Sequence, residues 1–301
     1  MFGLKGEKRS MNVYHKIINF ILLFYCFQLQ SNQRTYITGN EFRKCADYIV
    51  EGCVANFNPK AIPPKSIIFI DVYSLPYFFS KIFPLIKNQF FLITHNGDAS
   101  APGEFVSYLN DSHIIKWFGQ NCDTIHSKFI PIPIGIPNPH WPHGNTKVFD
   151  ETLDYLESIS QKKIQKLYIN FPYIATSNPS VRGPLYEFFK NKQFAVFADK
   201  KPWKEYLLET AQYQFILSPF GNGLDCIRTW EALLVGSIPV VKKSTLDALY
   251  ENLPVIIVNE WDEVTEEYLI KKYKEIIKKP FKKEKLFMDY WIEEIRRYKE
   301  S

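Results

Sequence analysis

Short apolar runs alternate with amphipathic segments along most of this chain. Four such runs lie in its first half, at residues 66–70, 90–94, 113–118 and 128–135. Five more lie in its second half, at residues 167–171, 194–198, 215–218, 238–241 and 255–258. Runs that are apolar throughout are typical of parallel strands buried on both faces of a sheet. The pattern therefore predicts an α/β protein with two halves, each built on a parallel sheet.

Segments with the apolar spacing of helices separate the second-half runs, and residues 148–163 have the same spacing after a loop rich in Pro, His and Asn. We take residues 148–163 as the connection between the two halves. The polar segment 31–65 precedes the first apolar run of the first half. The expected domains are residues 32–148, residues 149–275 and a C-terminal helical segment, 276–301. The aromatic face of that last segment must dock on the protein.

The composition is that of a globular protein rather than of a nucleic-acid binder. The chain has 301 residues, 46% of them apolar and 16% aromatic, and a formal net charge of only +5. Much of the basic excess lies at 271–285, where glutamates interrupt it, as on a solvated helical face. No nucleic-acid partner is expected.

The N-terminus has the pattern of a secretory signal. Basic residues precede the apolar run at 17–27, which is shorter than the roughly 20 residues that a spanning helix needs. Residues 1–31 are therefore predicted to be a signal peptide or a short signal anchor, the alternative being a buried N-terminal helix or strand. The expected location is the secretory pathway, in the ER or Golgi lumen, either type II anchored or secreted. The sequon at Asn110 is permissive for glycosylation. If 17–27 is no signal, the protein is cytoplasmic.

Four cysteines lie beyond that segment: Cys45, Cys53, Cys122 and Cys226. An even number is compatible with disulfides in a lumenal protein, and Cys45 and Cys53 are close enough to pair across a short loop. No cysteine or histidine has the spacing of a metal site, so no metal is expected.

The segment 215–241 combines features of an anion site. A buried strand is followed by a turn in which Gly221 and Gly223 allow positive φ or close backbone approach. Asp225 is placed to N-cap the helix that follows. A glycine turn and a helix N-terminus at the carboxyl edge of a parallel sheet favour a phosphate or diphosphate ligand.

Two side chains on that helix fit the same hypothesis. Arg228 is a plausible partner for the anion, and Glu231, three residues on, suits the two hydroxyls of a vicinal diol. The alternative is that Arg228 and Glu231 pair on the helix surface and that the glycines only form a tight turn. The segment is neither a Walker A loop nor a G-x-G-x-x-G fingerprint.

The run SPFGNGLDCIRTWEALLVGSIPVV, residues 218–241, resembles the donor-site segment of exostosin-like glycosyltransferases, an inverting family. It is closest in pattern to the ribitol xylosyltransferase-like branch. Similar stretches lie at 117–145 and 178–189, so the resemblance spans about 65–260. The residues that match the pattern at candidate site positions are Gly221, Asn222, Gly223, Asp225, Arg228, Glu231, Lys242 and Arg182.

The resemblance implies a GT-B fold, in which two Rossmann-like domains with parallel sheets face a central cleft. The C-terminal domain would bind a nucleotide-sugar, with UDP as the expected nucleotide, and the final helix would pack back on the N-terminal domain. No cofactor and no metal would be needed, because a helix dipole and basic side chains take the place of a metal.

The resemblance also implies roles for the matched residues. Gly221, Asn222 and Gly223 would approach the diphosphate, Arg228 would neutralise it and Glu231 would hold the ribose. Arg182 and Lys242 would add positive charge, although Lys242 is equally well explained as a solvated lysine.

The acceptor, a glycan or glycoprotein hydroxyl, would bind to the N-terminal domain. Inversion needs a general base there, and THNGD at 94–98 offers Asp98 and His95 at the end of a strand. The alternative is that this segment is only a turn. Two other functions stay open: a catalytically silent GT-B protein that binds nucleotide or glycan, and a retaining GT-B transferase.

Overall fold

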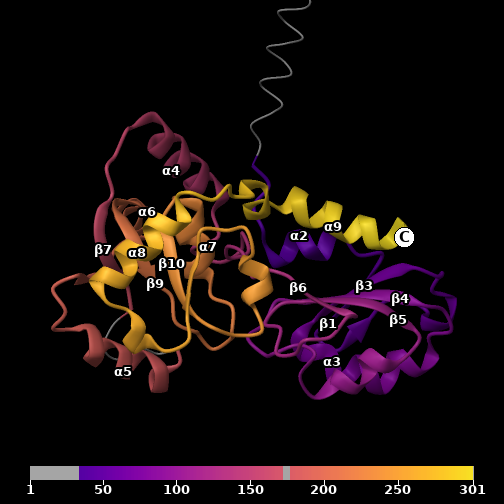
Figure 1. Cartoon of the computed structure of the whole chain (residues 1–301). Coiled ribbons are helices and arrows are strands. Elements are labelled where there is room, and N and C mark those ends of the chain that lie inside the picture. Colours follow the sequence, from indigo (N-terminus) through magenta and orange to yellow (C-terminus); the bar gives the residue numbers. More distant parts are fainter. Residues whose placement is uncertain (1–33, 172–176, 301) are drawn as a thin grey trace, which may run out of the picture. The chain divides into compact units, whose positions relative to one another are not determined.

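The computed structural model of the chain describes residues 34–171 and 177–300 (Figure 1). The predicted signal segment at 1–31 lies outside the described residues. Within the described ranges, no helix is both long enough and apolar enough to cross a membrane.

The first sheet has the strand order β2-β1-β3-β4-β5-β6, and every neighbouring pair is parallel except β1 and β2. Its strands are β1 (Tyr48–Glu51), β2 (Val54–Ala55), β3 (Ser66–Asp71), β4 (Phe90–His95), β5 (Ile114–Gly119) and β6 (Phe129–Pro131). The runs predicted at 66–70, 90–94 and 113–118 form β3, β4 and β5. The run predicted at 128–135 is a strand only at its start, because Pro131 and Pro133 have no N–H to continue the ladder.

Strand β1 lies in the segment 31–65, for which we predicted no strand. Only Val50 of its four residues is buried, so β1 lacks the continuous apolar run of its neighbours. Its place in the sheet comes from parallel pairing with β3, which the local pattern does not reveal.

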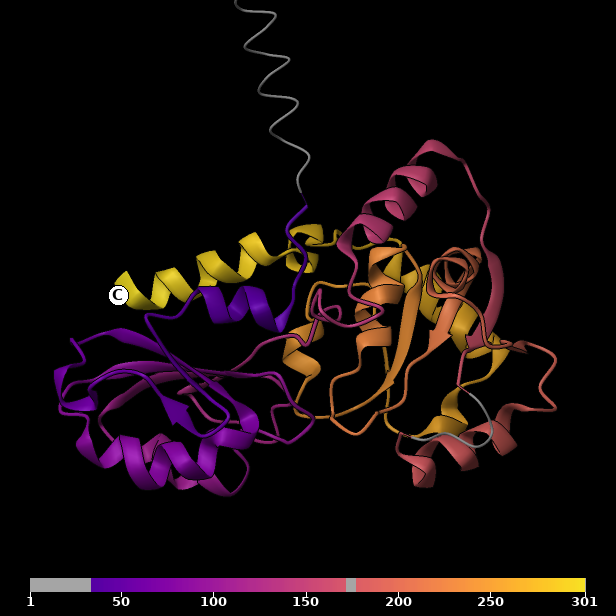
Figure 2. The ribbon, with the colours of Figure 1, turned by 180° about the vertical axis from the view of Figure 1, so that it is seen from behind.

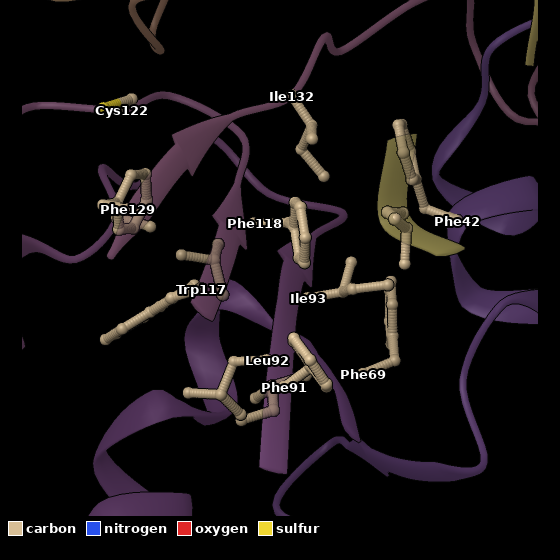
Figure 3. Close-up of a cluster of buried hydrophobic side chains, with 14 of the residues drawn as sticks. Phe42, Phe69, Phe91, Leu92, Ile93, Trp117, Phe118, Cys122, Phe129 and Ile132 are labelled. Atoms are coloured by element: carbon tan, nitrogen blue, oxygen red, sulfur yellow. The ribbon is translucent and has the colours of Figure 1, made fainter. Parts of the chain in front are cut away.

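Both faces of the first sheet carry apolar side chains. Leu92 and Trp117 lie on one side of β4 and β5, and Ile93 and Phe118 lie on the other (Figure 3). Helices α2 (Gly39–Lys44) and α9 (Met288–Glu300) lie beside one another over the second of these sides (Figure 2). The ring of Phe118 contacts that of Tyr298 in α9, with centroids 5.7 Å apart.

Short helical turns cover the opposite face and join the strands. In the first half they are η1 (Pro59–Ala61), η2 (Val72–Ser74), α3 (Leu75–Tyr77), η3 (Phe78–Ile82), η4 (Phe83–Leu85) and η5 (Gly103–Asn110). Phe79 of η3 stacks on Tyr108 of η5 with ring centroids 4.0 Å apart, and it also contacts Trp117. The turns between 75 and 86 therefore replace the regular crossover helices of a Rossmann half.

The second sheet is wholly parallel and has the strand order β11-β10-β9-β7-β8. Its strands are β7 (Ile164–Ile169), β8 (Ala195–Phe197), β9 (Tyr213–Leu217), β10 (Ile238–Lys242) and β11 (Ile256–Val258). Helices α5 (Pro179–Phe189) and α8 (Glu266–Ile276) share a core with one face of this sheet. Helices α4 (Thr146–Ser158), α6 (Trp203–Gln212) and α7 (Ile227–Leu234) pack on the other side. The remaining turns are η6 (Asp247–Tyr250), η7 (Trp261–Glu263) and η8 (Lys283–Leu286).

The order of strands in the second sheet creates a topological switch point. From β7 the chain first adds β8 on one side, and it then returns to add β9 on the other side of β7. The connections that leave β7 and β9 therefore diverge to opposite faces. In open parallel sheets the crevice outside such a switch point is where ligands bind.

These features confirm the predicted fold class. Two parallel-sheet α/β halves, with the last helix packed on the core of the first, form the architecture known as GT-B. Cys45, Cys53, Cys122 and Cys226 are all free, so the pairing of Cys45 with Cys53 that their spacing allows is not formed. Cys45 and Cys53 are close in sequence but lie in different parts of the fold. Cys45 is the C-cap of α2, whereas Cys53 is exposed in the turn between β1 and β2.

Candidate functional site

The glycine turn after β9 packs tightly against the first half of the protein. A Cβ atom on Gly223 would lie 2.5 Å from Asn121 Nδ2, far inside van der Waals contact. Asn121 itself is fully buried at the carboxyl end of β5. Its Nδ2 donates to the carbonyl oxygens of Gly97 and Asp98, and its Oδ1 accepts from the backbone N–H of Asp225 at 2.8 Å. Of the two roles predicted for this glycine, close approach is therefore the one it has, since its φ is not positive.

Asp225 does not N-cap α7, contrary to the prediction. The N-cap of α7 is Cys226, and no side chain caps its first turn. The carboxylate of Asp225 is buried and accepts instead from Ile134 N at 2.7 Å, Cys226 N at 2.9 Å and Trp230 Nε1 at 3.0 Å. Burial raises the pKa of Asp225 to about 6, and these donors oppose the rise. Because Ile134 belongs to the first half, Asp225 joins the two halves beneath the turn.

Arg182 and Arg228 lie close together at the switch point of the second sheet. Both guanidinium groups face the ring of Phe171, at 5.9 and 5.7 Å from its centroid. Both also approach the sulfur of Cys226, at 4.0 and 3.6 Å. Arg228 Nε donates to Asn170 Oδ1, just beyond β7. The cluster therefore joins the carboxyl end of β7, the start of α7 and the first turns of α5.

Neither arginine forms an ion pair among residues 34–171 and 177–300, although the charge of Arg228 reaches the buried carboxylate of Glu231. Arg182 is only 8% exposed, and its Nε has no hydrogen-bond partner within the described part of the chain. Burial and the charge of Arg228 lower the pKa of Arg182. A buried cation without a counter-charge is costly unless an anion binds beside it.

The surroundings of the arginine pair also favour an anion. A Cβ on Gly221 would lie 3.3 Å from Arg182 Nη2, so the glycine turn passes directly over the pair. The uncapped first turn of α7 leaves backbone N–H groups without side-chain acceptors. Gly221, Arg182 and Arg228 are thus brought together as one cluster.

Glu231 lies away from this cluster. It is buried, and its two oxygens accept from Trp203 Nε1 at 3.0 Å and from the Tyr206 hydroxyl at 3.1 Å. Burial raises the pKa of Glu231, while these donors and the charge of Arg228 oppose the rise. The surface ion pair between Arg228 and Glu231, the alternative weighed above, is not formed. Helical spacing alone places Glu231 at the edge of the apolar face of α7. Trp203 and Tyr206 of α6 cover its carboxylate and bury it.

Lys242 is also outside the cluster. It ends β10, and its Nζ lies 2.7 Å from Glu260 Oε2. The charge that the resemblance assigns to the anion site is therefore already paired with a carboxylate.

Asp98 is linked to the glycine turn from the other side. The exposed carboxylate of Asp98 accepts from Asn222 Nδ2 at 3.2 Å, and its backbone N–H donates to the Tyr73 hydroxyl at 3.1 Å. Asp98 also lines a cavity of about 710 Å³ at the carboxyl edge of the first sheet. One residue of the second half, Ile227, reaches that cavity. The carboxylate therefore lies where the glycine turn meets the cavity.

His95 lines the same cavity, but its ring nitrogens are occupied. Nδ1 accepts from the backbone N–H of Asn96 at 2.8 Å, and Nε2 lies 3.1 Å from the carbonyl oxygen of Pro133. Burial lowers the pKa of His95 to about 4, and the ring stacks on Phe42. This environment suits a neutral, positioning histidine, so of the two candidate bases Asp98 has the more suitable geometry.

Three residues of this region were missed from sequence: Asn121, Cys226 and Gln120. Asn121 has a positive φ of 53° just after β5. Asparagine after an apolar run is the one feature of the sequence that indicates such a conformation. Cys226 gave no signal because Arg182, one of its two arginine neighbours in the cluster, lies in α5, 44 residues earlier in the chain. For metals, the described part of the chain contains no group of three His, Cys, Asp or Glu side chains that could hold an ion.

No family model matches the chain, and no curated protein matches its sequence. Among solved structures, the UDP-GlcNAc 2-epimerase from Methanocaldococcus jannaschii is 11% identical over 71% of this chain and 70% of that chain, with a TM-score of 0.31. The trehalose-6-phosphate phosphatase N-terminal domain from Candida albicans is 13% identical over 80% and 73%, with a TM-score of 0.37. The α,α-trehalose-phosphate synthase (UDP-forming) from Burkholderia vietnamiensis is 10% identical over 79% and 69%, also with a TM-score of 0.37. Similarity at this level says nothing about the activity of this chain.

Proposed function

We propose that the protein is a glycosyltransferase that moves a sugar from a nucleotide-sugar to an acceptor hydroxyl. The observation that carries the proposal is the pair of arginines, Arg182 and Arg228, which lie together at the switch point of the second sheet and form no ion pair with any carboxylate that the structure describes. Two guanidinium groups beside an uncapped helix N-terminus and a glycine turn form a site for a group with two negative charges. A diphosphate has this charge.

A nucleoside diphosphate fits this position for a second reason. Switch points of parallel sheets bind nucleotides, with the phosphates at the helix that follows the strand. The resemblance of 218–241 to a family that uses nucleotide-sugars supports the same ligand and favours UDP. The arginines would supply the charge that a divalent ion supplies in metal-dependent transferases, so we propose a metal-independent donor site.

The proposed reaction is a single displacement with inversion. Asp98 removes the proton from the acceptor hydroxyl as its oxygen forms a bond to the anomeric carbon. The bond from that carbon to the diphosphate oxygen breaks, and the departing negative charge develops beside Arg182 and Arg228. The hydrogen bond from Asn222 orients the Asp98 carboxylate without taking its second oxygen.

Asp98→Asn tests this assignment. Release of UDP from a panel of UDP-sugars, with glycoside acceptors, is measured beside UDP binding by the same variant. We expect transfer to fall by about 10²–10⁴-fold while binding is unchanged, because the variant loses only a general base. Binding without turnover in the unmodified protein, for every acceptor, would favour a silent binding protein instead. The anomeric configuration of the product, read by NMR, separates an inverting enzyme from a retaining one.

A further inference from the structure

The cavity beside Asp98 carries two exposed aromatic side chains. Tyr73 is 60% exposed and Trp141 is 58% exposed, and both line the cavity. Single exposed rings are common on protein surfaces, but two that line one cavity together offer a larger apolar surface of the kind that contacts ligands. The flat apolar face of such a ring packs well on the C–H face of a sugar ring, while polar groups at its edge remain in water.

Three polar side chains that line the cavity present hydrogen-bond acceptors: Gln120, Asp98 and Glu51. Gln120 lines it at 4% exposure, and Gln120 Nε2 donates to the carbonyl oxygen of Gly97 at 3.0 Å, which sets the orientation of the amide. Gln120 Oε1 is then left buried without a hydrogen-bond partner among the residues that the structure describes. The carboxylates of Asp98 and Glu51 line the same cavity. A ligand that satisfies these groups must bring donors, as sugar hydroxyls do, whereas ionised carboxylates and phosphates bring only acceptors.

The charges around the cavity also disfavour an anionic ligand. No lysine or arginine is among the described residues that line it. Arg43, from outside the lining, is paired with Glu51 at 3.0 Å. Three histidines line the cavity. Both ring nitrogens of His95 are occupied, so only His140 and His143, in the loop after β6, could face an anionic ligand among the described lining residues.

We propose that this cavity binds an uncharged, hydroxyl-rich sugar and rejects sugars that carry a carboxylate or a phosphate next to the reacting position. Its role as the acceptor site rests on the proposed function. The donor and acceptor sites then have opposite character, because the arginine pair takes an anion and the cavity beside Asp98 excludes one.

Matched pairs of ligands test this inference by binding rather than by turnover. Methyl hexosides are compared with the corresponding methyl uronides and 6-phosphates by saturation-transfer NMR on the full chain, at millimolar concentrations. We expect at least one hexoside to bind, with its uronide and 6-phosphate bound at least about tenfold more weakly. Equal or tighter binding of the charged member of that pair would overturn the inference, and so would the absence of binding by every hexoside.

Variants place the binding in the cavity. Trp141→Ala should weaken hexoside binding about tenfold, while Tyr155→Ala, which removes a ring that is 52% exposed outside the cavity, should leave it unchanged. Glu51→Gln should improve uronide binding several-fold, because it removes a carboxylate and frees Arg43. Equal effects of Trp141→Ala and Tyr155→Ala would contradict the assignment.

UDP binding, measured on the same sample, separates this inference from the proposed function. If UDP binds and no hexoside does, the inference about the cavity fails alone. If hexosides bind and UDP does not, the proposed transferase fails and the cavity stands as a neutral-sugar site.

Discussion

Replacing Gly223 by alanine tests the tight joint between the glycine turn and the first half. The added Cβ would lie 2.5 Å from Asn121 Nδ2 and 2.8 Å from its Cγ and Oδ1. Asn121 is fully buried and cannot yield without losing its bonds to Gly97, Asp98 and Asp225. Three hydrogen bonds at about 0.5–1.5 kcal/mol each give a loss of roughly 2–4 kcal/mol. Alanine also stiffens the unfolded chain, which returns only about 0.4–1 kcal/mol.

We therefore expect Gly223→Ala to lower the free energy of unfolding by about 1–3 kcal/mol, measured by urea denaturation. Gly183→Ala is the matched control. Gly183 lies in α5, where no described atom outside its own helix backbone and its chain neighbours lies within 4 Å of an added Cβ, and Pro184 follows it directly. The gain in helix propensity and the crowding before proline oppose each other, so alanine there should change the free energy of unfolding by less than about 1 kcal/mol. In an Asn121→Ala background the cost of Gly223→Ala should largely vanish. Additivity of the two changes to within about 0.5 kcal/mol would refute the contact.

Three further predictions concern Asp225, Lys242 and Cys226. Because burial raises the folded pKa of Asp225 to about 6, the folded state holds this proton more tightly than the unfolded state. The contribution of Asp225 to the free energy of unfolding should then fall by about 2 kcal/mol as pH rises from 4 to 7, and Asp225→Asn should flatten the measured profile; an unchanged slope would contradict the assignment. Lys242→Ala should leave UDP affinity within about twofold in calorimetric titration, because Glu260 already pairs with this lysine, and a tenfold loss would restore Lys242 to the donor site. UDP should slow the alkylation of Cys226 by iodoacetamide, followed by peptide mass spectrometry, but not that of exposed Cys53, since the sulfur of Cys226 lies between the two arginines. Equal protection of both cysteines would mean that UDP binds elsewhere.

The strands of both sheets could be predicted because most are apolar on both faces. β3, β4 and β5 each lie at the centre of a sheet, so almost every side chain in them is buried and the run is visible in the sequence. β1 was missed because only Val50 is buried, and its pairing depends on β3. Local pattern therefore identifies a strand with a continuous apolar run, including the edge strands β8 and β11, better than a strand such as β1 that buries one residue.

The parts of the site were easier to predict than their arrangement. Arg182 and Arg228 were both candidates, but their proximity depends on β9 returning beside β7, which no local pattern specifies. Asp225 was expected to cap a helix because short-range geometry favours it. Its actual partner Ile134 lies 91 residues earlier in the chain. Glu231 likewise follows helical spacing, and its burial comes from Trp203 of another helix.

The central claim is that UDP binds at the arginine pair. Calorimetric titration of the protein with UDP and, separately, with uridine tests it directly. We expect UDP to bind far more tightly than uridine, because the diphosphate meets two guanidinium groups. Arg182→Met and Arg228→Met should each weaken UDP about tenfold or more while leaving uridine unchanged. If UDP binds no better than uridine, or equally well to the protein with both arginines replaced, the proposed donor site is wrong.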